Sequence, residues 1–215
     1  MIFVACSGFP VPVSRYWTEF PAVEITETEL GIPGEGTVRR WLRESPDGFA
    51  FSLIAPQTIA ASGFQRSKDN KALTEAMGRL ANTLSARAIV FVAPEDFKPN
   101  RNTRAAVKSF VDALPAKFPR IVLDLPAWKP AEVVELSEKR RVVAAYDPTG
   151  EEAVEDESLT YLRLPGPAGR RSRYDEAAID LIAEHCRGIK SETTMCVFRN
   201  IDMHANAGSL KKKLR

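Results

Sequence analysis

The sequence predicts a single α/β domain, a compact TIM-like (β/α)8 barrel with mainly parallel strands. Eight short apolar runs alternate with amphipathic stretches along the 215 residues, which is the pattern of successive βα units. Most of these runs are apolar at nearly every position, as expected for strands that are covered on both faces. The length lies near the lower limit of about 200 residues for such a barrel. We therefore expect residues 1–215 to form one domain.

An open, doubly wound sheet is the competing architecture. That fold usually carries a G-x-G-x-x-G turn after its first strand. Here the first apolar run continues as Cys6-Ser7-Gly8-Phe9-Pro10, which lacks this spacing. The closed barrel is therefore favoured.

The expected strands are the apolar runs themselves, several of them rich in β-branched residues. In chain order they are Ile2–Cys6, Ala22–Thr26, Phe49–Ile54, Ala88–Ala93, Arg120–Leu125, Val142–Tyr146, Thr160–Leu164 and Met195–Arg199.

Helical patterns follow most of these strands. In Asn70–Leu84, apolar residues recur at i, i+4, i+7 and i+11, which indicates one buried face. The pattern is weakest after the first strand, and after the sixth, where the acidic stretch Glu151–Glu157 takes its place. The expected helices are Val13–Phe20, Thr37–Arg43, Asn70–Leu84, Thr103–Leu114, Ala131–Ser137, Tyr174–Cys186 and a last helix that starts near His204.

Charge and hydropathy exclude some classes of function. Thirty Lys and Arg against 28 Asp and Glu give a net charge of +2, too small to indicate nucleic-acid binding from bulk electrostatics. No apolar run approaches the roughly 18 residues of a membrane span. The first six residues read as a strand and not as a signal peptide, so we expect a cytoplasmic protein.

Cysteine and histidine usage excludes several metal and redox sites. The three cysteines, Cys6, Cys186 and Cys196, form no C-x-x-C pair, which excludes a zinc ribbon or a redox dithiol. The two histidines, His185 and His204, are too few for a histidine-rich metal centre. A magnesium site made of carboxylates stays open, and no cofactor is predicted.

Four groups of residues resemble a known family. They are Cys6–Phe9 ahead of Tyr16-Trp17, the block from Phe20 to Phe51 with Pro46-Asp47-Gly48-Phe49, Tyr161–Leu164 with Gly166, and Val197–Asn200 followed by Asn206-Ala207. In this order they are similar to the YecE-like family (domain of unknown function 72). The resemblance implies a TIM-barrel-like fold and supplies no settled activity.

Several positions depart from the family pattern. Polar or basic residues that the resemblance leads one to expect are replaced by Ile54, Gln57, Ala60-Ala61, Val92–Glu95, Val122–Leu125 and Pro165. The chain therefore resembles a shortened member whose site is eroded. Any activity that relatives possess does not transfer to it directly.

Candidate site residues follow from the rule that barrel enzymes place chemistry at the carboxyl ends of strands. The polar residues at or near these ends are Ser7, Glu24, Asp124, Asp147, Arg163, Arg199, Asn200 and Asp202. Glu24 lies within an apolar segment, where a carboxylate must be paired or protonated, and Arg163 is its natural partner. Two roles stay open for this pair: a general acid/base with an anion clamp, or an ion pair inside the barrel that meets no ligand.

Asp124, Asp147, Asn200 and Ser7 are further candidates. Each aspartate closes a strand just before a proline, where it serves as a loop cap or as part of an acid/base or magnesium pair. Asn200 either orients a ligand or caps the last helix. Ser7 lacks the G-x-S-x-G context of a nucleophile and is placed among the ligand-binding candidates.

The loop Pro165–Arg173 is the most suggestive anion site. TIM barrels often bind phosphate in the loops after the seventh and eighth strands. Gly166 allows close backbone approach, and Arg170 and Arg171 offer bidentate donors. The alternative is an exposed turn in which Ser172 or Asp175 caps the next helix.

His204 is the better placed of the two histidines for acid/base chemistry, since His185 sits in a helical apolar stripe. With Glu24, Arg163 and Asp124 it completes the predicted catalytic set. The expected function is binding of a small phosphorylated or carboxylated ligand at the barrel mouth, with catalysis left open. The alternatives are a scaffold or pseudoenzyme with a protein partner, or nucleic-acid contact through Arg170–Arg173 and Lys211–Arg215. The sequence does not define the oligomeric state.

Overall fold

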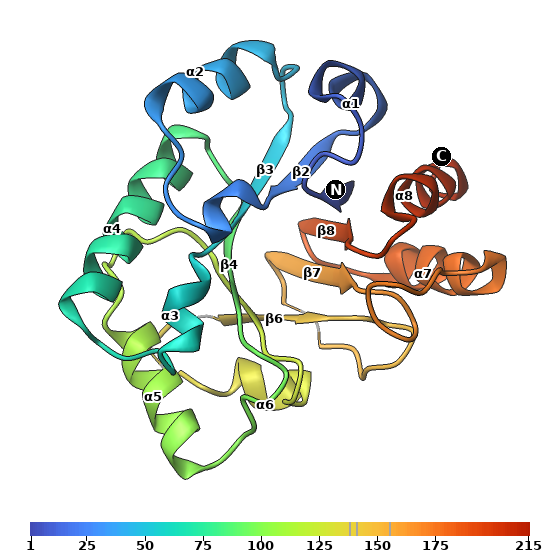
Figure 1. Ribbon diagram of the computed structural model, residues 1–215. Helices are drawn as coiled ribbons and strands as arrows, with labels where there is room; N and C mark the ends of the chain where they lie inside the picture. The colour runs from blue at the N-terminus through green and yellow to red at the C-terminus, as the bar shows by residue number, and fades with distance from the viewer. Residues whose placement is uncertain (138, 141, 155) are drawn as a thin grey trace.

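A closed parallel barrel forms the centre of the protein in a computed structural model that describes residues 1–137, 139–140, 142–154 and 156–215 (Figure 1). Within these residues, eight strands follow one another around the barrel in sequence order, and β8 pairs with β1 to close it. The strands are β1 (Ile2–Ser7), β2 (Ala22–Ile25), β3 (Ala50–Ile54), β4 (Ala88–Val92), β5 (Ile121–Asp124), β6 (Val142–Tyr146), β7 (Leu159–Leu164) and β8 (Thr193–Phe198).

Helices surround the barrel on its outside (Figure 1). Their bounds are α1 (Val13–Glu19), α2 (Glu35–Glu44), α3 (Gln57–Ala61), α4 (Lys68–Thr83), α5 (Arg101–Asp112), α6 (Pro130–Val134), α7 (Glu176–Gly188) and α8 (Met203–Lys213), with a 3-10 turn η1 (Glu27–Glu29). Among the described residues, no helix is both long and apolar enough to cross a membrane.

The predicted barrel is confirmed, and each expected strand forms with its ends moved by at most two residues. The structure adds α3 and η1, which are five and three residues long and too short to show a helical period in the sequence. As expected, the described residues between β6 and β7 contain no helix. Glu155 of the acidic stretch lies outside the described residues.

Two apolar clusters stabilise the barrel. The larger cluster lies between the strands and the helices, and Trp41, Tyr16 and Phe91 are among its most deeply buried members. The smaller cluster joins inward-facing residues of all eight strands, and alanines such as Ala5 and Ala22 keep it narrow.

Strand periodicity decides which polar residues point into the barrel. Side chains alternate between the two faces of a strand, so a residue two positions after an interior residue is also interior. Ala22 and Tyr161 belong to the interior cluster, and the next interior positions on their strands are Glu24 and Arg163. Parallel register places Glu24 beside Ser7 of β1. Polar side chains therefore form the layer just above the apolar interior, near the carboxyl end of the barrel.

Candidate functional site

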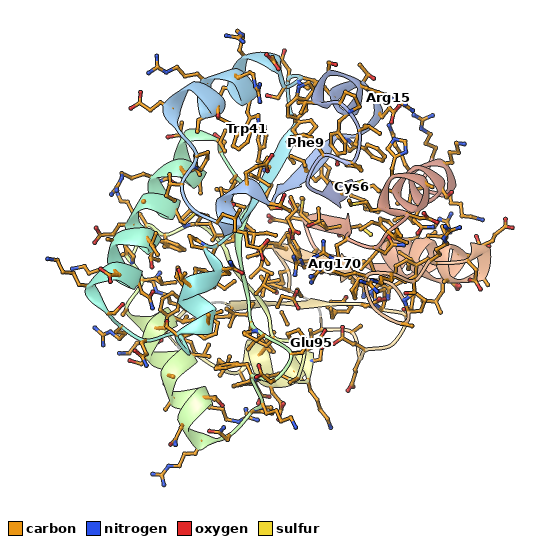
Figure 2. The ribbon with its side chains drawn as sticks, viewed as in Figure 1. Cys6, Phe9, Arg15, Trp41, Glu95 and Arg170 are labelled. Carbon is orange, nitrogen blue, oxygen red and sulfur yellow. The ribbon has the colours of Figure 1, made fainter. Side chains whose placement is uncertain are left out.

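A cavity of about 380 Å3 opens at the carboxyl ends of β5 to β8. It is lined by the ends of these strands and by the loops that follow β4, β6 and β7, including Glu95 and Arg170 (Figure 2). Its charged lining residues are Glu95, Asp124, Asp147, Glu151, Arg163, Arg170 and Arg199. The cavity lies where the fold predicts a ligand site.

Glu24 lies beneath this cavity in a fully occupied hydrogen-bond network. The residue is completely buried. Its Oε1 accepts from Ser7 Oγ at 2.6 Å and from Arg163 Nη2 at 3.2 Å. Its Oε2 accepts from Tyr161 Oη at 2.9 Å and from Arg163 Nε at 3.1 Å. Both carboxylate oxygens are thus engaged by donors from the barrel itself.

The charges of Glu24 and Arg163 stabilise each other. Burial alone would raise the pKa of Glu24, but the Arg163 guanidinium and its hydrogen bonds hold this pKa below the ordinary value. The pKa of Arg163 is raised, because Glu24 and Asp124 outweigh the effect of burial. Glu24 does not line the cavity, whereas Arg163 reaches it. The geometry therefore matches an ion pair inside the barrel, which is one of the two roles predicted for this pair.

Asp124 connects this network to the cavity. Its Oδ2 accepts from Arg163 Nη1 and from Arg199 Nη1, the latter at 3.3 Å. The expected cap on a loop amide is not what its carboxylate forms, because the adjoining arginines are stronger partners than a backbone N–H. The Asp124 carboxylate thus links Arg163, whose guanidinium nitrogens are all hydrogen-bonded, to Arg199 at the cavity wall.

Arg199 is a half-buried cation whose charge and hydrogen-bond donors are only partly compensated. Among the described residues, its Nε is a buried atom without a hydrogen-bond partner. Burial and the neighbouring Arg163 lower the pKa of Arg199, and Asp124 and Glu24 offset this only in part. A half-buried charge that lacks full compensation is stabilised when an opposite charge binds beside it.

Asp147 lines the cavity as a turn residue. Its Oδ1 accepts from the N–H and the hydroxyl of Thr149, at 2.9 and 2.7 Å. Its Oδ2 accepts from Tyr174 Oη, which in turn accepts from the N–H of Gly166 at 2.9 Å. Of the roles left open for Asp147, the loop contact is the one that its geometry shows.

Glu151 stands beside Asp147 at the rim. Its Oε2 accepts from the N–H of Asp147 at 2.6 Å. Partial burial of the carboxyl raises the pKa of Glu151, and the negative charges of Asp124 and Asp147 add to the rise. Nothing in the sequence distinguished Glu151 from its acidic neighbours, because only the fold turns it towards the cavity.

The loop Pro165–Arg173 contributes one of its two predicted cations, Arg170, to the cavity lining. Both Arg170 and Arg171 are exposed, but Arg170 lines the cavity and Arg171 does not. Arg173 pairs with Asp202 at 2.8 Å. Gly166 has a φ of +102°, and a Cβ there would lie 2.6 Å from the carbonyl oxygen of Gly169. The close backbone approach expected at Gly166 is therefore an approach to other residues of the same loop, Gly169 and Ser172.

Asn200 fastens this loop to α8. Its Nδ2 donates to the carbonyl of Ser172 at 3.1 Å and to Asn206 Oδ1 at 2.8 Å. The residue is 1% exposed and does not line the cavity. In the structure, Asn200 therefore links the loop to α8.

His204 and Ser7 do not reach the cavity either. His204 Nε2 lies 2.5 Å from Glu19 Oε2, between α8 and α1 on the outside of the barrel. The expected position of His204 at the mouth is corrected, since the first turn of α8 directs it towards α1. Ser7 is buried beneath the mouth as a donor to Glu24.

Sequence reasoning missed two tyrosines of the site. Tyr161 donates to Glu24 and is 2.8 Å from Ser52 Oγ, and Tyr174 joins Asp147 to Gly166. The two-residue period of β7 could have revealed Tyr161, which precedes Arg163 on the same face. Tyr174 lies in a loop, where no periodicity applies.

The described residues contain no group of three or more His, Cys, Asp or Glu side chains placed to hold a metal ion.

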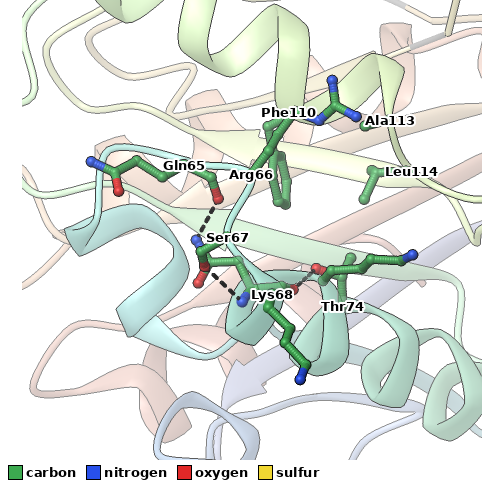
Figure 3. Close-up of a pocket in the computed structure, with 10 residues that line it drawn as sticks. Gln65, Arg66, Ser67, Lys68, Thr74, Phe110, Ala113 and Leu114 are labelled. Atoms are coloured by element: carbon green, nitrogen blue, oxygen red, sulfur yellow. Dashed lines mark hydrogen bonds between the residues drawn. The ribbon is translucent and has the colours of Figure 1, made fainter.

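A second cavity, of about 350 Å3, lies outside the barrel between the start of α4 and the end of α5 (Figure 3). Its cations, Arg66, Lys68 and Lys71, are exposed. Of the described residues, those with a buried side-chain polar atom lacking a partner are Trp17, Arg199 and Asn200, and none of them lines this second cavity.

Comparisons with known proteins agree with this architecture. A family model described as "Protein of unknown function DUF72" matches residues 12–215. A crystal structure of a DUF72 family protein from Enterococcus faecalis V583 has a TM-score of 0.81 at 16% identity, covering 100% of this chain and 95% of that one. A DUF72 family protein from Thermotoga maritima MSB8 has a TM-score of 0.70 at 18% identity, covering 100% and 99%.

A more distant barrel is also similar. A xylose isomerase domain protein from Alicyclobacillus acidocaldarius subsp. acidocaldarius has a TM-score of 0.61 at 13% identity and covers 100% of this chain and 97% of that one. At these identities the solved structures show the fold alone. No curated protein matches the sequence.

Proposed function

The chain belongs to the DUF72 family of proteins of unknown function, and we propose that it binds a small phosphorylated or carboxylated ligand in the cavity at the carboxyl end of its barrel. Arg199 carries this proposal. It lines the cavity, shares Asp124 with Arg163, and keeps a buried Nε without a partner among the described residues. An anion beside Arg199 supplies the compensation that the barrel leaves incomplete.

Arg170 and the loop around it support the same ligand class. The Arg170 side chain lines the cavity and forms no ion pair with any described residue. A guanidinium offers donors in a planar fork that suits carboxylate and phosphate oxygens. Together, Arg170 from the loop after β7 and Arg199 from the end of β8 offer the ligand two cationic contacts.

The proposal concerns binding and includes no reaction. The two carboxylates that the sequence predicted as catalytic, Glu24 and Asp124, are both held by arginines. A general acid or base must reach the reacting atom, and Glu24 does not line the cavity. We therefore favour a ligand-binding barrel over a catalyst.

The alternative partners have less support. In the basic tail, Lys213 pairs with Asp180 at 2.6 Å, and Lys211 donates to the carbonyl of Glu19. These contacts occupy charges that a nucleic-acid surface would need.

The described cysteines are free, buried thiols, which supports the cytoplasm as the proposed location.

Calorimetric titration with inorganic phosphate and with malonate tests the proposal. We expect at least one of these anions to bind, and Arg199→Gln to weaken it about tenfold or more. Arg40→Gln, which removes an exposed cation from α2, is the matched control and keeps wild-type affinity. Equal affinity in the Arg199 variant, or no binding of either anion, would overturn the proposal. Binding of an oligonucleotide that weakens steeply with salt would favour the nucleic-acid alternative instead.

A further inference from the structure

The charges that line this cavity suit a ligand that carries a cation as well as an anion better than they suit an anion alone. Three arginines line it, but so do four acidic residues, Glu95, Asp124, Asp147 and Glu151. With all of these groups ionised, the lining is net negative. A simple anion gains from the arginines and at the same time meets repulsion from the carboxylates.

The other three acidic residues of the lining, Asp147, Glu151 and Glu95, form no ion pair with any described residue. The Asp147 carboxylate accepts from neutral hydroxyl and amide groups. Glu151 accepts from one backbone N–H, which leaves its Oε1 without a hydrogen-bond donor among the described residues. Glu95 is exposed and forms no ion pair with any described side chain. By contrast, Asp124 is held between two arginines.

Glu151 thus lines the same cavity as Arg170 and Arg199 without pairing with either. No ion pair within 4.0 Å joins Glu151 to Arg170 or to Arg199 in the described part of the chain, although all three line the same space. Had the barrel evolved these groups to neutralise each other, direct contact would be the simplest arrangement. The gap between them is instead open to a molecule that contacts both.

We infer that the ligand is zwitterionic: its carboxylate or phosphate lies against Arg199 and Arg170, and its protonated amine lies against Glu151. This inference rests on the proposed function, because it assigns the anionic end of the ligand to the same arginines. An amine also offers up to three donors, which match the unoccupied Oε1 of Glu151 and the nearby Glu95 carboxylate.

The electrostatics of the cavity lining agree with this arrangement. The pKa of Arg199 is lowered and that of Glu151 is raised, so each group is less stable in its charged form than it would be in water. A bound zwitterion stabilises both charged forms at once. A dicarboxylate stabilises the first and further destabilises the second.

The test compares ligands that differ in one charged end. Unbranched aminoalkanoates, from glycine to ε-aminohexanoate, are titrated calorimetrically beside the alkanoates of equal length and beside glutarate, at mildly alkaline pH where the amine stays protonated. We expect the best aminoalkanoate to bind about tenfold tighter than its matched alkanoate. Glu151→Gln should reduce this preference to less than about threefold, whereas the exposed neighbour variant Glu152→Gln should keep it.

Two failures can be told apart. If alkanoates or glutarate bind as tightly as every aminoalkanoate, or if Glu151→Gln keeps the preference, the zwitterionic ligand is wrong while the anion site stands. If no probe binds and phosphate and malonate also fail, both proposals are wrong. If aminoalkanoates bind equally well to Arg199→Gln, the assignment of the anionic end to Arg199 is overturned.

Discussion

Glu24 and Glu151 are two acidic residues at the same end of one barrel, and their surroundings differ in almost every respect. Glu24 is completely buried and accepts hydrogen bonds on both oxygens, including a pair from Arg163. Glu151 is exposed at the rim and accepts one backbone N–H. The pKa of Glu24 is lowered despite its burial, whereas the pKa of Glu151 is raised.

This difference distinguishes residues that stabilise the barrel from residues that form the candidate site. Burial of a charge is tolerated where the fold supplies a counter-charge and enough donors, as it does around Glu24. At the cavity wall the fold supplies too few hydrogen-bond partners and counter-charges for Glu151 and for Arg199. We therefore interpret the Glu24 network as the support of the mouth and the incompletely compensated groups as the surface that a ligand completes.

The largest expected effect comes from breaking the buried network. Glu24→Gln leaves Arg163 buried with half of its counter-charge, and we expect a loss of about 3–5 kcal/mol in the free energy of unfolding, measured by urea denaturation. The double variant Glu24→Gln/Arg163→Met removes both charges and should recover part of this loss. A loss below about 1 kcal/mol in the single variant would mean that the network is not structural.

A smaller effect is expected in the loop that carries Arg170. Gly166→Ala forces a positive φ on alanine and places its Cβ 2.5 Å from Ser172 Oγ, so we expect a loss of about 1–3 kcal/mol and weaker anion binding. Gly169→Ala is the control, because its φ of +83° is also positive but its Cβ would meet open space. Equal losses in the two variants would show that backbone strain alone matters and that the close packing at Gly166 does not.

The smallest effect concerns the rim carboxylate and depends on pH. Because the pKa of Glu151 is raised above its ordinary value of 4.5, the folded protein disfavours its charged form. Glu151→Gln should therefore stabilise the ligand-free protein at neutral pH, by less than about 1 kcal/mol for so exposed a group. The gain should vanish below the ordinary pKa, where Glu151 is protonated in both states.

Urea denaturation at neutral and at acidic pH measures this difference. Glu152→Gln serves as the comparison and should show little dependence on pH from this source, since Glu152 is exposed outside the cavity. A Glu151 variant that is less stable than wild type at neutral pH would contradict the raised pKa and would make Glu151 a structural residue like Glu24.

The sequence by itself determined the barrel and the identity of its interior acid. Eight apolar runs with helices between them predicted the closed sheet, since these patterns depend on local periodicity and on burial of both strand faces. The apolar neighbours of Glu24 and of Arg163 likewise predicted that the two charges meet, because a buried carboxylate requires a partner.

The tertiary structure alone decided which polar residues face the cavity. Arg170 and Arg171 are adjacent and chemically identical, yet one lines the cavity and the other does not. His204, expected at the mouth, contacts Glu19 of α1, and Glu151, which no sequence pattern singled out, lines the cavity. Loop and helix-end orientations depend on contacts between segments far apart in the chain, such as Asn200 with Ser172. Local periodicity carries no information about these long-range contacts, so the sequence pattern could not predict them.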